Sequence, residues 1–264
     1  MEGFLGVPDT GPLLFWGLTF AAFITTFLGT VTGTAGGLML LATMAFFYPP
    51  LILIPVHTVV QLGAGTSRAV LMWRFVRKSL ILPFCIGSIV GAVAGAQIFV
   101  TLSSSILQML LGGFILFVLY TPRFAAGGPE RTRFGILGFA ATFLGVFVSA
   151  TGTFLSPFVA HASSDRRIHV STMATLMAFT HVAKLVTFGV IGFSVGAYVP
   201  LMAAMVVATV AGNWAGGHAL DVIPEKIFRI VFKILLTVLA IRLLIGAASD
   251  AGWLEPLGIG RGAS

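Results

Sequence analysis

Charged side chains are scarce in this sequence. Only 9% of its 264 residues are charged, whereas 58% are hydrophobic. A soluble domain carries about 25% charged residues, so the composition excludes an ordinary soluble protein. Windows of about 19 apolar residues, the length that marks a membrane helix, cover most of the chain. We therefore predict an all-α polytopic membrane protein.

Cysteine and buried acid are also nearly absent. Cys85 is the only cysteine, which excludes an intrachain disulfide and a cysteine metal cluster. No acidic residue lies deep in an apolar run, which excludes a proton relay or a sodium site built from buried carboxylates. Histidine is then the candidate titrating group. Because His57 and His161 alone are a weak metal signal, we predict no metal, no cofactor and no catalytic residue.

The net charge of +7 comes from basic residues clustered between the apolar runs. Such clusters are typical of cytoplasmic loops and not of a nucleic-acid-binding surface. We expect contact with membrane lipid and none with nucleic acid. The four clusters are Arg74, Arg77 and Lys78; Arg123, Arg131 and Arg133; Arg166 and Arg167; and Lys226 and Arg229.

Two stretches of small residues interrupt the apolar runs. The first run, about residues 12–47, is too long for one span of about 20 residues, and the stretch 29–37 (GTVTGTAGG) divides it. The second stretch is 149–153 (SATGT). Glycine and threonine at these places predict a broken helix followed by a short half-helix.

The second half of the sequence repeats the first. Internal repeats of this kind are typical of secondary transporters. The matching positions are Phe27-Leu28-Gly29 with Phe143-Leu144-Gly145, the GxxxG pair Gly91 and Gly95 with Gly212 and Gly216, and Ile106 with Ile227.

The polar stretch 121–133 is the predicted boundary between the repeats. We divide the chain into a first membrane repeat (1–122), a cytoplasmic linker (123–133) and a second membrane repeat (134–264), which together form one transport domain. If each short half-helix completes a crossing, all four basic clusters lie in the cytoplasm and both termini lie outside. Each repeat then crosses five times, so the two repeats are inverted. We expect a multi-pass protein of the bacterial cytoplasmic (inner) membrane.

The two breaks are the first candidate site. A broken membrane helix exposes backbone N–H groups that the bilayer core does not satisfy, and helix N-termini bind anions. Two such breaks in inverted repeats would meet near the midplane, where transporters bind substrate. The alternative is close helix packing through small residues. The predicted oxyanion-binding residues are Thr32, Thr34, Gly36, Gly37, Thr151, Gly152 and Thr153.

Cations inside the spans are the second candidate site. Lys184 lies near the middle of the predicted span 168–191, where a lysine costs about 2.5–3.5 kcal/mol on insertion scales. His181 shares its helix face. By the repeat, Lys184 corresponds to Ser67, next to Arg68. Because no carboxylate accompanies these cations, an anionic ligand is the expected partner; snorkelling toward the headgroups is the alternative for Lys184 and Arg68.

Uncharged polar residues within the spans add to this site. They are Gln61, Gln97, Asn213 and His218, of which Gln61 is included among the predicted substrate-binding residues. Gln97 and His218 are equivalent in the repeat, and a related polar pair near the centre is what a shared site predicts. Hydrogen bonding between helices is the alternative.

On these motifs the sequence resembles the TauE/SafE sulfite exporter family, which includes permeases of the toluenesulfonate-uptake type. The resemblance covers about residues 12–246. It rests on the two breaks (GTAGGL at 33–38 and ATGTFLSP at 150–157), the basic turn WRFVRK at 73–78 and the small-residue helix GSIVGAVAGA at 87–96. The family's pattern is a run of glycines followed by a proline; the first break lacks the proline and the second keeps one glycine.

The resemblance implies outward transport of sulfite or organosulfonates, with no enzymatic step. We therefore predict a secondary transporter, an exporter of a small sulfur-containing anion. A passive anion channel is the alternative. An intramembrane enzyme is less favoured, because buried carboxylates and paired Cys/His spacing are absent. The oligomeric state is left open.

Overall fold

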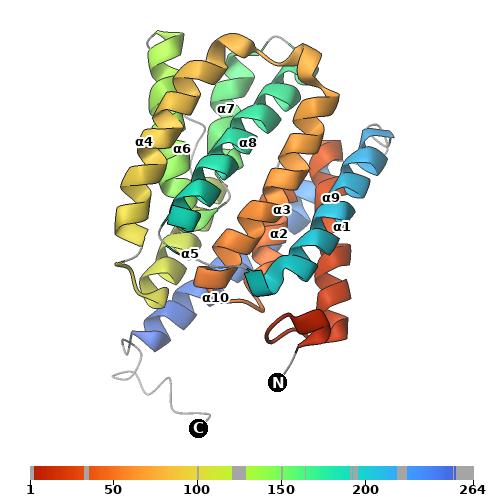
Figure 1. The fold of residues 1–264 in the computed structure, drawn as a ribbon, viewed down its shortest axis with the longest axis vertical. Coiled ribbons are helices and arrows are strands. Elements are labelled where there is room, and N and C mark those ends of the chain that lie inside the picture. Colours follow the sequence, from red (N-terminus) through yellow and green to blue (C-terminus); the bar gives the residue numbers. More distant parts are fainter. Residues whose placement is uncertain are drawn as a thin grey trace.

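A computed structural model gives the fold of the chain. It describes residues 3–32, 36–99, 101–120, 129–149, 151–163, 165–190, 192, 196–218, 225–251 and 253, and for 32, 166, 225–232 and 235 it describes the backbone only. Thr34 of the first break lies outside these ranges. The described residues form α-helices joined by short turns (Figure 1), which confirms the predicted all-α class.

Both predicted breaks divide a helical run in two. In the first half of the chain, a long helix and a short helix flank the break: α1 (Pro12–Thr32) and α2 (Gly36–Met44). The second half has the same order, α6 (Glu130–Val148) and then α7 (Gly152–His161). The short helices begin at Gly36 and Gly152, at the same spacing that separates Phe27 from Phe143.

Three further helices complete each half. They are α3 (Pro50–Leu71), α4 (Ile81–Phe99) and α5 (Ser104–Tyr120) in the first, and α8 (Arg166–Val190), α9 (Val199–His218) and α10 (Glu225–Asp250) in the second. Pro50 is the first residue of α3. Proline is tolerated there because the N–H group at the first position of a helix has no acceptor within the helix. Pro157 lies inside α7, which ends at His161, and the last residues of the predicted linker are helical from Glu130.

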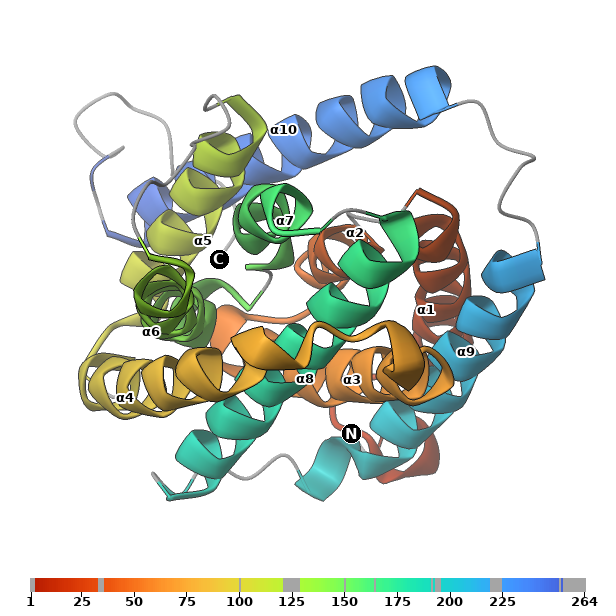
Figure 2. The ribbon, with the colours of Figure 1, turned by 90° about the horizontal axis from the view of Figure 1, so that it is seen from above.

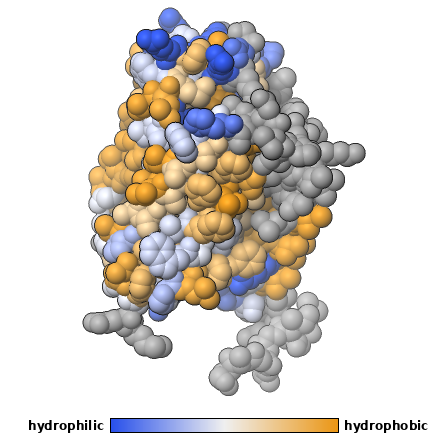
Figure 3. All heavy atoms as spheres, turned by 90° about the vertical axis from the view of Figure 1, so that its right-hand side faces the viewer, coloured by the Kyte–Doolittle hydropathy of each residue, from blue (hydrophilic) through white to orange (hydrophobic). Residues whose placement is uncertain are grey.

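The chain is a multi-pass membrane protein. Among the described residues, six helices are long and apolar enough to cross a bilayer. Large apolar side chains are exposed along the outer helices, for example Leu82, Ile89 and Val93 on α4 and Val207 on α9. Hydrophobic side chains also cover much of the middle of the face shown in Figure 3. Exposed apolar surface of this extent is expected where lipid, and not water, is the solvent.

The helices of the two halves pack against each other reciprocally. Helix α1 packs on α9, and α4 packs on α6. The central pair is α3 with α8, and an outer pair is α5 with α10. Exchanging each helix for its counterpart in the other half leaves this set of pairs unchanged. The inverted orientation of the halves across a membrane stays a prediction.

Glycines make the two reciprocal contacts possible. A Cβ atom on Gly212 would lie 2.6 Å from the carbonyl oxygen of Phe23, and one on Gly91 would collide with that of Phe139. Phe23 and Phe139 are related by the same repeat spacing as Gly36 and Gly152. Small residues let membrane helices approach this closely, so both GxxxG motifs serve as packing surfaces.

The short helices occupy the centre of the molecule. Figure 2 shows α2 and α7 enclosed by the other helices, and in Figure 1 α7 lies in the upper part and α2 lower down. The hydroxyls of Thr10 and Tyr48 are 2.6 Å apart, so after α2 the chain returns to the end of the molecule at which α1 begins. A contact at the opposite end shows the same for α6 and α7.

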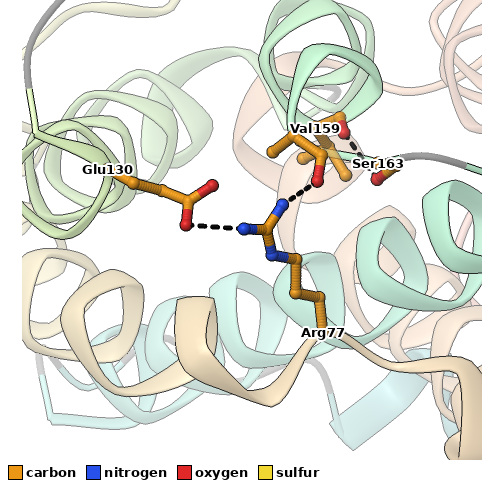
Figure 4. A network of polar contacts seen from close by, with 5 residues as sticks. Arg77, Glu130, Val159 and Ser163 are labelled. Carbon is orange, nitrogen blue, oxygen red and sulfur yellow. Dashed lines mark hydrogen bonds and ion pairs between the residues drawn. The ribbon is translucent and has the colours of Figure 1, made fainter.

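That opposite contact is centred on Arg77 (Figure 4). Its guanidinium is paired with Glu130 at 2.8 Å and donates to the carbonyl of Ala162 at the end of α7. Arg167 stacks on Phe75 nearby, 5.5 Å from the ring centre. Described members of three of the four basic clusters therefore lie at one end, and the side chains of the fourth, Lys226 and Arg229, lie outside what the structure describes. That this end faces the cytoplasm stays a prediction.

We predict that Gly212→Ala destabilises the protein by about 1–3 kcal/mol, because backbone atoms of α1 cannot move aside for the added methyl group. Thermal unfolding of the purified protein in detergent measures the effect. Gly113→Ala is the control, since a Cβ atom there meets no atom within 4 Å. Equal melting temperatures for the two variants would contradict the packing role of Gly212.

Candidate functional site

A cavity of about 150 Å³ lies where the two short helices begin. Gly36, Gly37 and Leu38 of α2 and Gly152 and Thr153 of α7 form part of its wall. The rest of the wall comes from α1 (Thr26, Gly29), α3 (His57, Gln61, Ala64, Gly65, Arg68), α8 (Met173, Ala174, Met177, His181) and Ser149. The space is large enough for several water molecules or one small anion.

Glycine at the start of α2 is required by its neighbours. A Cβ atom on Gly36 would collide with the carbonyl of Thr25 and lie 2.9 Å from the Cα of Gly29. One on Gly37 would collide with the side-chain amide of Gln61. The two glycines therefore let the N-terminus of α2 approach both α1 and α3, and they leave its first peptide groups open to the cavity.

Backbone N–H groups at the start of α7 have no side-chain cap. Thr151 is the N-cap residue, and its side chain makes no capping hydrogen bond. The first N–H groups of a helix lack intrahelical acceptors, and they carry the positive end of the helix dipole. At both short helices these groups lie at the cavity, so the wall is suited to an anion on two sides.

Arg68 is the cation on the cavity wall. Its Nη2 donates to Thr30 Oγ1 at 2.6 Å and to Asn213 Oδ1 at 2.7 Å. Asn213 in turn donates to the carbonyl of Ala64 at 2.8 Å. The Nε of Arg68 is buried and has no partner in the described part of the chain, and no ion pair to Arg68 is found there either. Neutral groups position this charge, and within the described residues it has no counter-ion.

Lys184 lies behind the wall and not on it. Its side chain is fully buried, and its Nζ donates to the carbonyls of Gly145 and Ser149, at 3.2 and 3.4 Å, and to Ser149 Oγ at 3.3 Å. The carbonyls at the end of a helix lack intrahelical donors, and a lysine there also interacts favourably with the dipole. Lys184 therefore caps the end of α6 at the break.

Ser149 and His57 join the two breaks. Ser149 ends α6 in the left-handed conformation, with φ of 59°. Its Oγ is 2.9 Å from Nδ1 of His57, and Nε2 of the same ring is 2.8 Å from the carbonyl oxygen of Gly37. One imidazole of α3 thus bonds the start of α2 and the end of α6.

Several buried polar atoms near the cavity have no hydrogen-bond partner among the described residues. They are Nε of Arg68, Nδ1 of His181 and the hydroxyls of Thr151 and Thr153. A buried polar group without a partner costs about 1–3 kcal/mol. A set of four at one place indicates that water or a ligand completes their bonds.

The structure brings most of the predicted site residues together. Gly36, Gly37, Gln61, Arg68, Gly152, Thr153 and His181 all line the one cavity. Thr151 is fully buried beside it. Thr32 is the last residue of α1, and its side chain, like Thr34, lies outside what the structure describes. Gln97 and His218 are exposed, so the proposed central polar pair of these two residues is wrong.

Sequence reasoning missed His57 and Ser149 as members of the site. The signal was present in α3, where His57, Gln61, Gly65 and Arg68 fall on one helix face at spacings of four, four and three. The repeat spacing of the breaks carries these four positions onto Met173, Met177, His181 and Lys184 of α8. At that spacing Lys184 corresponds to Arg68, and not to Ser67 as the sequence analysis aligned it.

No group of three or more His, Cys, Asp or Glu side chains that could hold a metal ion occurs within the described residues. The chemistry of the wall is that of an anion site: amide N–H groups, hydroxyls and a guanidinium.

Comparison with known proteins gives one match. The profile of the family described as sulfite exporter TauE/SafE matches residues 18–243, which is most of the chain. Neither a curated protein nor a solved structure matches the sequence.

We predict that Asn213→Ala lowers the free energy of unfolding by about 1–3 kcal/mol, because it removes one acceptor of Arg68 Nη2 and the donor to the buried carbonyl of Ala64. Asn213 is 6% exposed. Gln97→Ala, which removes an exposed amide of α4, is the matched control. Chemical or thermal unfolding in detergent distinguishes them. An equal decrease in the free energy of unfolding in both variants would show that the hydrogen bonds of Asn213 stabilise the protein no more than an exposed amide does.

Proposed function

We propose that this chain, which belongs to the TauE/SafE sulfite exporter family, exports a small sulfur-containing anion, such as sulfite or an organosulfonate, across the bacterial cytoplasmic membrane. The family is one of transporters and not of enzymes. The observation that carries the proposal is the single cavity into which the N-termini of both α2 and α7 open.

The cavity matches the chemistry of a sulfur oxyanion. Such an ion has several oxygen atoms that accept hydrogen bonds and a negative charge that requires compensation in the bilayer core. The first N–H groups of the two short helices supply donors from two directions. The unpaired hydroxyl of Thr153 supplies another, and Thr151 lies behind it. Thr32 and Thr34 of the first break are proposed to act in the same way.

Arg68 supplies the charge in this proposal. Its unpaired Nε and the absence of a carboxylate partner in the described chain mean that an anion would be its first counter-ion. Charge-assisted hydrogen bonds are roughly twice as strong as neutral ones. His181 and Gln61, which also line the cavity, are proposed to orient the anion. Lys184 acts indirectly, by holding the end of α6 in place.

Transport requires that the cavity face each side of the membrane in turn. We propose that this occurs by movement of one group of helices against another, as in other transporters with repeated halves. The glycine contacts of α1 with α9 and of α4 with α6 are backbone contacts that resist sliding. The movement is therefore assigned to the central helices α3 and α8, whose side chains surround the cavity.

We predict that sulfite and small alkanesulfonates raise the melting temperature of the purified protein. Arg68→Gln should weaken their binding about 10–150-fold, because a charge-assisted bond of about 1.5–3 kcal/mol is lost. Isothermal titration gives the two dissociation constants. Arg74→Gln, at an exposed arginine away from the cavity, should bind as the unaltered protein does.

Thr153→Val extends this test to a residue that carries no charge. It keeps the shape of the side chain and removes the hydroxyl, so binding should weaken by about 3–10-fold. If Arg68→Gln and Thr153→Val both bind these anions with unchanged affinity, the assigned site is wrong.

We further predict that anion efflux from proteoliposomes saturates with the internal sulfite concentration, because each cycle of a carrier moves a limited number of ions. A passive channel, the alternative, would give flux that rises linearly over the same range. Efflux is followed with a sulfite-reactive dye outside the vesicles, and protein-free vesicles correct for leakage. Linear flux, blocked by Arg68→Gln, would show a channel through the same site.

A further inference from the structure

Three polar side chains lie in a row between the buried end of α6 and the cavity. Lys184 Nζ is 3.3 Å from Ser149 Oγ, and Ser149 Oγ is 2.9 Å from His57 Nδ1. Lys184 is fully buried and His57 is 1% exposed. Ser149 and His57 line the cavity, whereas Lys184 does not. The row therefore connects Lys184, which lies outside the cavity, with the His57 ring, which lines it.

The partners of His57 fix the direction of each hydrogen bond. A carbonyl oxygen only accepts, so Nε2 carries the proton that it donates to Gly37. Nδ1 of the neutral ring is then the acceptor, and the hydroxyl of Ser149 donates to it. The Ser149 oxygen in turn accepts from the Lys184 ammonium. Each donor thus faces an acceptor along the whole row.

The titratable groups around His57 are few. Helix α8 contributes Lys184 and His181, and α3 itself contributes Arg68. Helix α2 has no titratable residue, and those of α5, α6 and α9 lie in their terminal turns: Tyr120; Glu130, Arg131 and Arg133; and His218. The amide nitrogen of Gln61 is 3.2 Å from Nε2 of His57; because both are donors, the amide fits better with its oxygen toward the ring.

We infer that Lys184, Ser149 and His57 form a proton relay at the wall of the anion cavity, and that the protein transports its anion together with one proton. This inference rests on the proposed function, because it concerns the same cavity. It adds a proton-binding site, and therefore a coupling ion, to that function.

The proton transfer balances within the three residues. An N–H bond of the Lys184 ammonium breaks as an O–H bond forms on Ser149. The original O–H bond of Ser149 breaks as an N–H bond forms at Nδ1 of His57. Lys184 becomes a neutral amine, and His57 becomes an imidazolium with both nitrogens protonated. This internal step leaves the number of bound protons unchanged. The carried proton is exchanged with water in the open cavity, which Ser149 and His57 line: an O–H bond of a hydronium ion breaks as an O–H bond forms on Ser149, a water molecule is left, and the original Ser149 proton passes to His57; release is the reverse.

The transfer moves positive charge toward the anion. On Lys184 the charge lies behind Ser149, whereas on His57 it lies at the cavity wall together with Arg68. Attraction between opposite charges is stronger in a low-dielectric site than in water. Because coupling between two binding equilibria is reciprocal, a proton in the relay strengthens anion binding, and the bound anion strengthens proton binding.

Methanesulfonate tests the relay, because it stays ionised at every pH used and any pH dependence then belongs to the protein. The full-length chain is reconstituted in liposomes, the membrane potential is clamped at zero with potassium and valinomycin, and a pH gradient is imposed. With one proton per anion, labelled methanesulfonate should accumulate in the alkaline lumen by up to about tenfold per pH unit. His57→Gln, which keeps a donor for Gly37 and does not titrate, should lower the final ratio of internal to external methanesulfonate to one, whatever its effect on the rate of exchange.

Ser149→Ala is the second variant, since it leaves both bases and removes the link between them. It should also lower the final accumulation ratio to one, whatever its effect on the rate of exchange. His161→Gln, at an exposed histidine outside the cavity, is the matched control and should accumulate normally. Normal accumulation in both test variants would overturn the relay and leave the proposed function standing. Loss of exchange in both would assign these residues a structural role and also overturn it. Failure of the unaltered protein to bind or exchange methanesulfonate and sulfite would overturn the proposed function itself.

Discussion

A backbone amide in the bilayer core must find a partner within the protein or in a ligand, because no water is there to supply one. This constraint determines how the backbone groups at both helix breaks of this protein are bonded. At the end of α6 Lys184 bonds the carbonyl of Ser149, and it also bonds the carbonyl of Gly145, which accepts the N–H of Ser149 as well. At the starts of α2 and α7 the exposed N–H groups meet at a cavity. The carbonyl groups at the break are thus bonded by a side chain, whereas the N–H groups are left for a ligand.

The constraint also accounts for the difference between two cations at related positions. Arg68 and Lys184 are separated by the repeat spacing of Gly36 and Gly152, and they lie on the facing helices α3 and α8. The lysine binds the end of a broken helix and has no access to the cavity. The arginine is held by Thr30 and Asn213 and lines the cavity. Both halves carry a positive charge at this position, and the local hydrogen-bond partners give each charge a different role.

Much of the fold could be predicted from the sequence. The two breaks, the short helices after them and the packing role of the GxxxG pairs all have local signals in glycine, threonine and hydropathy. The place of Lys184 had no such signal, because its ligands are backbone carbonyls, which every residue has. Gln97 and His218 occupy related positions, yet both are exposed. A repeat in the sequence shows which residues correspond in the two halves, but it does not show whether they lie in the centre of the molecule or on its surface. His57 was recoverable from its helix face, since it shares one with Gln61 and Arg68.

The reciprocal packing has a consequence for how the protein is made. Helix α1 packs mainly on α9 and on the short α2. The glycines of α9 that receive it, Gly212 and Gly216, are synthesised 189 residues after Phe23 and Phe27, whose carbonyls they approach. During translation the first helix therefore stays in the lipid, with the packing surface at Phe23 and Phe27 uncovered, until α9 has entered the membrane. Packing of the first helix necessarily follows insertion of most of the helices between them, and a chain that ends before α9 would lack the partner on which its own first helix depends.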